Sequence, residues 1–367
     1  MSTQNQRPSP DDAPRESRRT SPALPEPRGV LSRLVVTTLR GGGSSGPLPL
    51  DTHDADPYGD DLQLALYTLY ELHYQGFDRV REDLEWDPEL LGLRRALEGR
   101  FLGALRANCR STDSAERALA DLLVEPIGDS RTSVSHHLQR DGELWQLREY
   151  AAARSLYHLK EADPHAWVIP RLHGRAKAGM VAVEFDEFGA GRAEDIHARL
   201  FADLMEDLAL ETAYGYYLDA APGEVLATVN LMSLLGLHRA LRGALVGHFA
   251  AVEVTSSPGS RRLAKAMRRS GAGPAAERFY DEHVEADAVH EQVVRREVIG
   301  GLLASEPGLE SDVVFGIEAT SFLEDRLGAR FLAAWHDERS ALRAPLPTAD
   351  RHGHRGVKRA CSPRAPG

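Results

Sequence analysis

The stretch FYDEHVEADAVHE, residues 279–291, decides how the rest of this chain is interpreted. It places His283, Asp287 and His290 at offsets of zero, four and seven. At about 100° per residue on a helix, these side chains fall within about 60° of one another and share one face. Cβ atoms on adjacent turns are about 5–6 Å apart, a span that metal–ligand bonds of about 2 Å can bridge. The pattern fits a metal site as well as it fits a solvated charged face.

The composition is that of an ordinary globular protein. Of 367 residues, 42% are hydrophobic and 27% are charged, which suits one large domain or two small ones. The net charge of −11 argues against a general nucleic-acid binder, which normally presents a basic face. Cys109 and Cys361 are the only cysteines, and they form neither a disulfide framework nor a thiolate metal site. Because the N-terminus also lacks the apolar run of a secretory signal, we expect a cytoplasmic protein.

The hydrophobic pattern predicts an all-α domain between two disordered tails. Residues 1–58 and the basic segment 343–367 cannot bury enough apolar area to offset the entropy of ordering, although a short apolar piece at 30–39 could dock on the domain. Residues 59–342 carry helical periodicity punctuated by Pro and Gly. Within them, residues 226–254 are the most apolar, but polar and charged residues interrupt them. We therefore expect a buried helix or helical hairpin there, broken near Gly236 and closed by Ser257-Pro258-Gly259, and no membrane span.

Two further places carry side chains of the kind that bind metals. Glu187 and His197 flank Gly189-Ala190-Gly191, whose glycines would break the helix and let a tight loop turn both side chains inward. A helix end followed by a new helix start would explain the glycines but not the two side chains. Glu71 sits on an apolar helix face, where a carboxylate costs several kcal/mol unless it is paired or binds a cation.

Together the candidates supply three carboxylates and three imidazoles: Glu71, Glu187, His197, His283, Asp287 and His290. Nitrogen and oxygen ligands without thiolate suit Fe(II), Mn(II) or Zn(II). Carboxylates and histidines that point inward from facing helices are also how helical bundles build di-iron and di-manganese sites.

These motifs resemble those of a known family. Glu71, the Glu187–His197 pair around a Gly-x-Gly break, and the final H-x3-D-x2-H run are similar to the haem-oxygenase-like iron-containing redox enzymes, also called haem-oxygenase-like di-iron oxidases. The similarity covers roughly residues 60–340. It implies a haem-oxygenase-like seven-helix bundle that uses non-haem iron and O2 to oxidise a small molecule. By motif it implies these ligands: Glu71, Glu187, His197, Asp287 and His290. His283 stands where some relatives have a carboxylate, which leaves another metal or a single tightly held ion open.

The resulting prediction is an O2-dependent non-haem iron oxidase or oxygenase. It would hold two Fe(II) ions, with manganese as an alternative, use O2 as co-substrate and act on a small organic substrate. Tyr157 and Glu161 are predicted as catalytic residues, and Glu161, Asp163 and Glu253 as groups that could orient a ligating histidine. A homodimer and an electron donor are expected as partners, with no nucleic acid and no membrane. Two alternatives stay open, a haem oxygenase with an axial histidine and a helical binding or scaffold module with a structural metal site.

Overall fold

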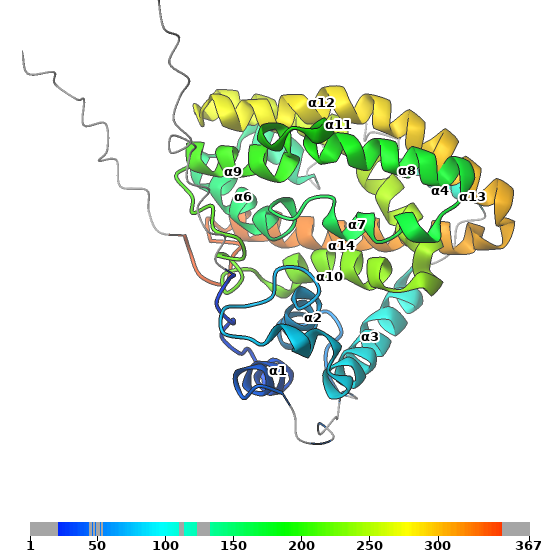
Figure 1. Cartoon of the computed structure of the whole chain (residues 1–367). Coiled ribbons are helices and arrows are strands. Elements are labelled where there is room, and N and C mark those ends of the chain that lie inside the picture. Colours follow the sequence, from blue (N-terminus) through cyan, green and yellow to red (C-terminus); the bar gives the residue numbers. More distant parts are fainter. Residues whose placement is uncertain are drawn as a thin grey trace, which may run out of the picture.

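The computed structural model describes residues 21–43, 46, 48, 52, 54–109, 114–122 and 133–346. Throughout these ranges the regular elements are helices, and no strand occurs among them (Figure 1). The prediction of an all-α protein is therefore confirmed. The predicted disorder of residues 1–20 and 347–367 lies outside the described residues.

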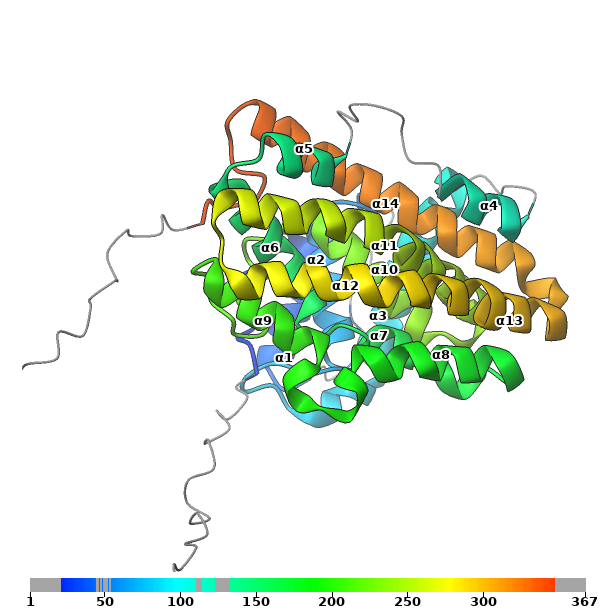
Figure 2. The ribbon, with the colours of Figure 1, turned by 90° about the horizontal axis from the view of Figure 1, so that it is seen from above.

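Three long helices form the body of the molecule: α11 (Arg242–Ser270), α12 (Pro274–Val293) and α14 (Glu310–His336). They run side by side, with α11 between the other two (Figure 2). The close approach of α11 to α14 depends on glycine. A Cβ atom at Gly247 would lie 1.9 Å from the carbonyl oxygen of Val313, and one at Gly316 would lie 1.9 Å from that of Ala244. Any larger residue would push the two backbones apart.

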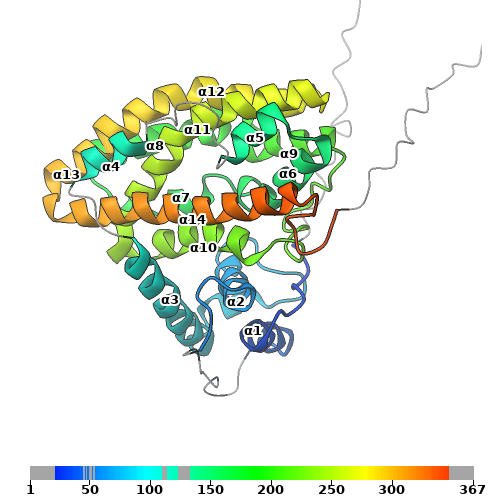
Figure 3. The same cartoon turned by 180° about the vertical axis from the view of Figure 1, so that it is seen from behind.

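The other helices pack around these three. Their bounds are α1 (Val30–Arg40), α2 (Asp60–Glu71), α3 (Pro88–Asn108), α4 (Ala115–Leu122), α5 (Val134–Arg140), α6 (Leu144–His158), α7 (Asp163–Ala166), α8 (Gly174–Glu187), α9 (His197–Asp207), α10 (Gly223–Leu237), the π-helical turn η7 (Val294–Ile299) and α13 (Gly300–Ser305). Helix α10 lies along α14 with α2 on its other side, and α1 covers α2 (Figure 3). Helix α9 packs on α12 and α6, while α8 packs on η7.

Helix α1 corrects the predicted N-terminal boundary. Val35, Val36 and Leu39 are buried in the contact of α1 with α2. The carboxylate of Asp61 accepts hydrogen bonds from two backbone N–H groups in the first turn of α1. Residues 21–43 are therefore an ordered part of the helical body, because the apolar face of α1 finds a partner that a tail would lack.

The apolar stretch 226–254 forms the predicted hairpin, and the predicted break near Gly236 falls at the end of α10. The predicted end at Ser257-Pro258-Gly259 is wrong, since α11 continues to Ser270 with Pro258 inside it. Proline removes one backbone donor there, and the packing of α11 between α12 and α14 outweighs that loss. No helix in the described ranges combines the length and the apolar character that crossing a membrane requires.

Candidate metal centre

The three residues at the start of the sequence argument lie on one buried face of α12. His283, Asp287 and His290 are each no more than 6% exposed. Helix α12 contacts α8, α9 and α11 along its length (Figure 2). These neighbours carry further carboxylates and a histidine that come close to the same face.

Cluster 1 joins four chain segments. Its residues are Glu161 from the turn between α6 and α7, Glu187 from the last position of α8, His197 from the first position of α9, and His283 from α12. One potential ligand atom from each residue lies within 4.8 Å of the others. The loop with Gly189 and Gly191, both at positive φ, brings Glu187 and His197 together, so that Oε2 of Glu187 lies 2.8 Å from Nδ1 of His197.

Cluster 2 lies beside cluster 1 and shares a residue with it. It consists of Glu187, Glu253 from α11, and Asp287 and His290 from α12, again with ligand atoms within 4.8 Å of one another. Glu187 Oε2 lies near His197 in cluster 1, while Glu187 Oε1 lies 3.6 Å from Nδ1 of His290 in cluster 2. One carboxylate therefore faces both clusters.

Each cluster holds three buried atoms without a hydrogen-bond partner among the described residues. In cluster 1 they are Glu161 Oε2, His283 Nε2 and His197 Nδ1, whose 2.8 Å contact with Glu187 Oε2 lacks the geometry of a hydrogen bond. In cluster 2 they are Glu253 Oε2, Asp287 Oδ2 and His290 Nδ1. A buried polar atom without a partner costs about 1–3 kcal/mol, so six in one place need an explanation. Metal ions would satisfy all six, and nitrogen and carboxylate donors fit divalent iron, manganese or zinc.

Two of the histidines are already oriented for metal binding. His283 donates its Nδ1–H to the carbonyl of Phe279 at 2.7 Å, which leaves Nε2 as the atom that faces cluster 1. His290 donates its Nε2–H to Asp186 at 3.2 Å, which leaves Nδ1 to face cluster 2. In metal sites, the second ring nitrogen of a ligating histidine is usually held by such an acceptor.

Glu161 is held by a residue that the sequence argument did not identify. His158 Nδ1 lies 2.8 Å from Glu161 Oε1, which leaves Oε2 turned to cluster 1. The turn that carries Glu161 includes Ala162 at φ 73°, a left-handed conformation that costs an alanine of the order of 1 kcal/mol. The chain accepts this strain where it presents a carboxylate to the cluster.

The electrostatics of both clusters call for positive charge. Burial lowers the pKa of His290, but the carboxylates around it outweigh burial and raise that pKa to about 11. In the same way, Glu161 and its neighbours outweigh burial and raise the pKa of His283 to about 10. Burial, with Glu187 and Asp287 nearby, raises the pKa of Glu253 to about 8. In the absence of metal, protons on these side chains supply the positive charge that metal ions would otherwise supply to the carboxylates.

The structure brings five of the six predicted ligands together and leaves Glu71 apart. The five are Glu187, His197, His283, Asp287 and His290. Glu71 belongs to neither cluster, and its carboxylate pairs with Lys160 at 2.9 Å and accepts a hydrogen bond from Tyr214 at 2.7 Å. Lys160 supplies the positive charge that a carboxylate on this apolar helix face needs.

Glu161 and Glu253 take more central positions than the sequence suggested. Both were predicted as groups that orient a ligand, and Glu161 also as a catalytic residue. Neither was predicted as a metal ligand, yet each contributes an atom to a cluster. Glu253 could have been found by the rule applied to Glu71, because it is an acidic residue in an otherwise apolar run. Predicted catalytic residue Tyr157 lines a cavity of about 20 Å³ between the clusters and α11.

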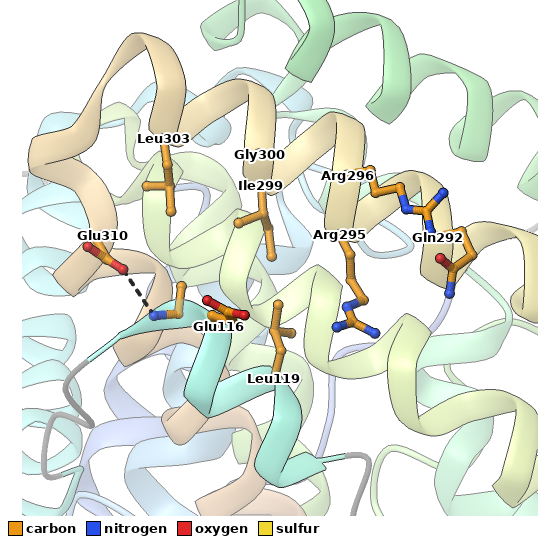
Figure 4. A pocket seen from close by; sticks show the side chains of 10 residues that line it. Glu116, Leu119, Gln292, Arg295, Arg296, Ile299, Gly300, Leu303 and Glu310 are labelled. Carbon is orange, nitrogen blue, oxygen red and sulfur yellow. Dashed lines mark hydrogen bonds between the residues drawn. The ribbon is translucent and has the colours of Figure 1, made fainter.

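A larger cavity, of about 350 Å³, lies away from the clusters, between α4, η7 and α13 (Figure 4). Gln292, Arg295 and Arg296 face it from one side, and Glu116 and Leu119 from the other. Two of its polar groups have partners within the protein: Arg295 pairs with Glu291, and the carboxylate of Glu310 accepts a hydrogen bond from the backbone of Ala115. Size alone therefore does not make it the reactive site.

A comparison with family models matches residues 148–325 to iron-containing redox enzymes. Just under half of the chain is therefore similar to this family. The match confirms the resemblance inferred from the sequence and supports a role in iron-dependent redox chemistry. The matched range contains all seven residues of the two clusters and leaves Glu71 outside. A comparison with curated proteins gives no match.

Proposed function

We propose that this protein is an oxidase or oxygenase that uses two non-haem iron ions and O2 to oxidise a small organic molecule. The observation that carries the proposal is the position of Glu187, whose two carboxylate oxygens face two separate buried clusters. A carboxylate shared in this way suits a pair of neighbouring metal ions. Carboxylates and histidines projecting inward from several helices are the usual way in which helical proteins hold such a pair.

The charge balance of the clusters supports two divalent ions. Four of the seven residues are carboxylates: Glu161, Glu187, Glu253 and Asp287. None of the seven is more than 8% exposed. Buried charge of one sign is strongly unfavourable unless it is paired, and two divalent cations would neutralise four carboxylates while the histidines stay neutral.

The residues of the chain would hold the ions and control what reaches them. Iron supplies one-electron and O2 chemistry, whereas the protein supplies geometry and a dry environment. Asp186 and the carbonyl of Phe279 fix two of the histidine rings. Phe249 and Val252 form an apolar wall that keeps bulk water from the clusters. An electron donor would complete the reaction cycle.

The test is an anaerobic Fe(II) titration followed by exposure to O2. We expect two equivalents of iron per chain, and O2 uptake with a change in visible absorption after mixing. Iron that binds at less than one equivalent to a protein of normal helicity would contradict the proposal.

Variants in one loop make the titration specific. Glu187→Gln should weaken binding of both ions, because Glu187 faces both clusters. Glu194→Gln is a matched control, since Glu194 is an exposed acidic residue seven positions further along the same connection. The control should bind two equivalents. Equal iron binding by both variants would argue against the shared carboxylate.

A purely structural metal site is the second candidate. The observation that favours it is the small free volume beside the clusters, about 20 Å³, which holds little more than one water molecule. A structural site would raise the melting temperature when metal is added but would consume no O2. The same titrated samples distinguish the two functions.

A further inference from the structure

One histidine lines the small cavity without belonging to either cluster. His165, on α7, borders the 20 Å³ cavity together with Phe249 and Val252 and is 2% exposed. It is not part of either group of potential ligands. A polar ring at this place needs a role other than the ones already described.

A chain of hydrogen bonds fixes which nitrogen of His165 carries the proton. Thr320 donates its hydroxyl hydrogen to the carbonyl of Gly316 at 2.7 Å, so its oxygen is an acceptor for His248. His248 must therefore carry its proton on Nδ1, which lies 2.7 Å from the Thr320 oxygen. Nε2 of His248, 3.1 Å from Nε2 of His165, is then the acceptor, and His165 is the donor. This leaves Nδ1 of His165 unprotonated.

The surroundings of both rings favour their neutral forms. Burial lowers the pKa of His248 to about 4. Burial, followed by the nearby His248, also lowers the pKa of His165 well below its usual range. Among the described residues no hydrogen bond involves Nδ1 of His165, whereas Nε2 is engaged with His248.

We propose that His165 is a substrate-binding residue that accepts a hydrogen bond at Nδ1 from an N–H or O–H group of the substrate. His248 and Thr320 are positioning residues, since they act only by fixing the tautomer of His165. This inference rests on the proposed function, because it takes the cavity beside the clusters as the place where the substrate reacts.

The cavity walls narrow the class of substrate. Phe249, Val252 and Ala162 are apolar, and His165 is a pure acceptor at this face. The free volume has room for a group the size of one water molecule. A molecule with an apolar body and a small amino or hydroxyl group at its reacting end fits these features, whereas an ionised carboxylate at that end has no hydrogen to donate to Nδ1 of His165.

The tautomer can be measured without knowing the substrate. The sample is the full chain with ¹⁵N-labelled histidine, loaded with diamagnetic zinc, and nitrogen chemical shifts show whether each ring nitrogen carries a proton. We expect Nδ1 of His165 to be unprotonated. Added hydroxylamine, which has N–H and O–H groups, should shift the Nδ1 signal in the direction of hydrogen bonding, while azide, which has no hydrogen, should not.

Variants of Thr320 test the chain of hydrogen bonds from Thr320 through His248 to His165. Thr320→Val removes the acceptor of the His248 Nδ1–H, so the proton of His165 should move to Nδ1, whereas Thr320→Ser keeps the hydroxyl and should keep the wild-type tautomer. A proton on Nδ1 of wild-type His165, zinc bound at that atom, or equal responses to hydroxylamine and azide would overturn the inference. Failure of zinc to bind would instead count against the dinuclear site, and the tautomer would still be read in the same sample.

Discussion

Lys160 Nζ lies 2.9 Å from Glu71 Oε2, and both side chains are only 1% exposed. The rings of Tyr67 and Tyr74 cover the ammonium at 4.9 and 4.2 Å. The buried carboxylate is thus neutralised by a lysine that directly precedes Glu161 in the chain. The ion pair ties α2 to the turn that presents a residue of cluster 1.

Glu71→Gln should therefore destabilise the protein without removing metal. The substitution leaves a buried ammonium without its counter-charge, and breaking a buried pair in this way costs about 3–5 kcal/mol. Urea unfolding should show this loss, while a metal titration should still give two equivalents per chain. The double variant Glu71→Gln/Lys160→Met should lose less than the single variant. A Glu71→Gln protein of unchanged stability that binds only one ion would show that Glu71 is a ligand after all.

The fold could be predicted because its signals are local. Helical periodicity and Gly or Pro punctuation gave the helical class and the break between α10 and α11. The errors at α1 and Pro258 have a different origin. Whether a short apolar segment docks, and whether a helix tolerates proline, depends on packing partners that are remote in sequence.

Partners that are remote in sequence also limited the prediction of the candidate site. His283, Asp287 and His290 could be placed on one face because a helix fixes their spacing. Glu71 and Glu253, by contrast, look alike in the sequence, each an acidic residue among apolar neighbours. What distinguishes them is the cation that each meets in space, a lysine for Glu71 and the proposed metal for Glu253, and no local pattern encodes that partner.

Asp186→Ala should weaken the ion in cluster 2 selectively. Asp186 is exposed, so its removal spares the core, but it accepts the Nε2–H of His290 at 3.2 Å and orients the ring. Loss of such a partner typically costs 10–100-fold in metal affinity. Titration with Co(II), whose visible spectrum reports each site, should show one weakened and one unchanged equivalent. Glu285→Ala, at an exposed acidic position of α12, is the control, and an equal effect of both variants would remove the role assigned to Asp186.

Metal affinity should rise with pH. The carboxylates of the clusters raise the pKa values of His283 and His290 to about 10 and 11. In the metal-free protein at neutral pH, both rings are therefore imidazolium ions, with a proton on each nitrogen. An ion must displace one of these protons to reach the ring nitrogen, and the competition weakens as the proton concentration falls. Each proton that an ion displaces should decrease the dissociation constant about tenfold per pH unit between pH 6 and 8. Zinc titrations at several pH values measure the slope, and affinity that is independent of pH would contradict it.

Glu184→Leu should stabilise the metal-free protein, and more so at higher pH. Both carboxylate oxygens of Glu184 are buried without a hydrogen-bond partner among the described residues, and burial, followed by the nearby Glu187 and Glu253, raises its pKa to about 9. The unfolded chain releases this proton near pH 4.5, whereas the folded protein keeps it until about pH 9, so the wild type loses stability as the pH rises between these values. At about 1.4 kcal/mol per pH unit, the advantage of the variant should grow by roughly 3 kcal/mol between pH 4.5 and pH 7. Urea unfolding of both proteins at the two pH values gives the difference directly. A constant difference would mean that Glu184 is ionised in the folded protein and is paired with a cation.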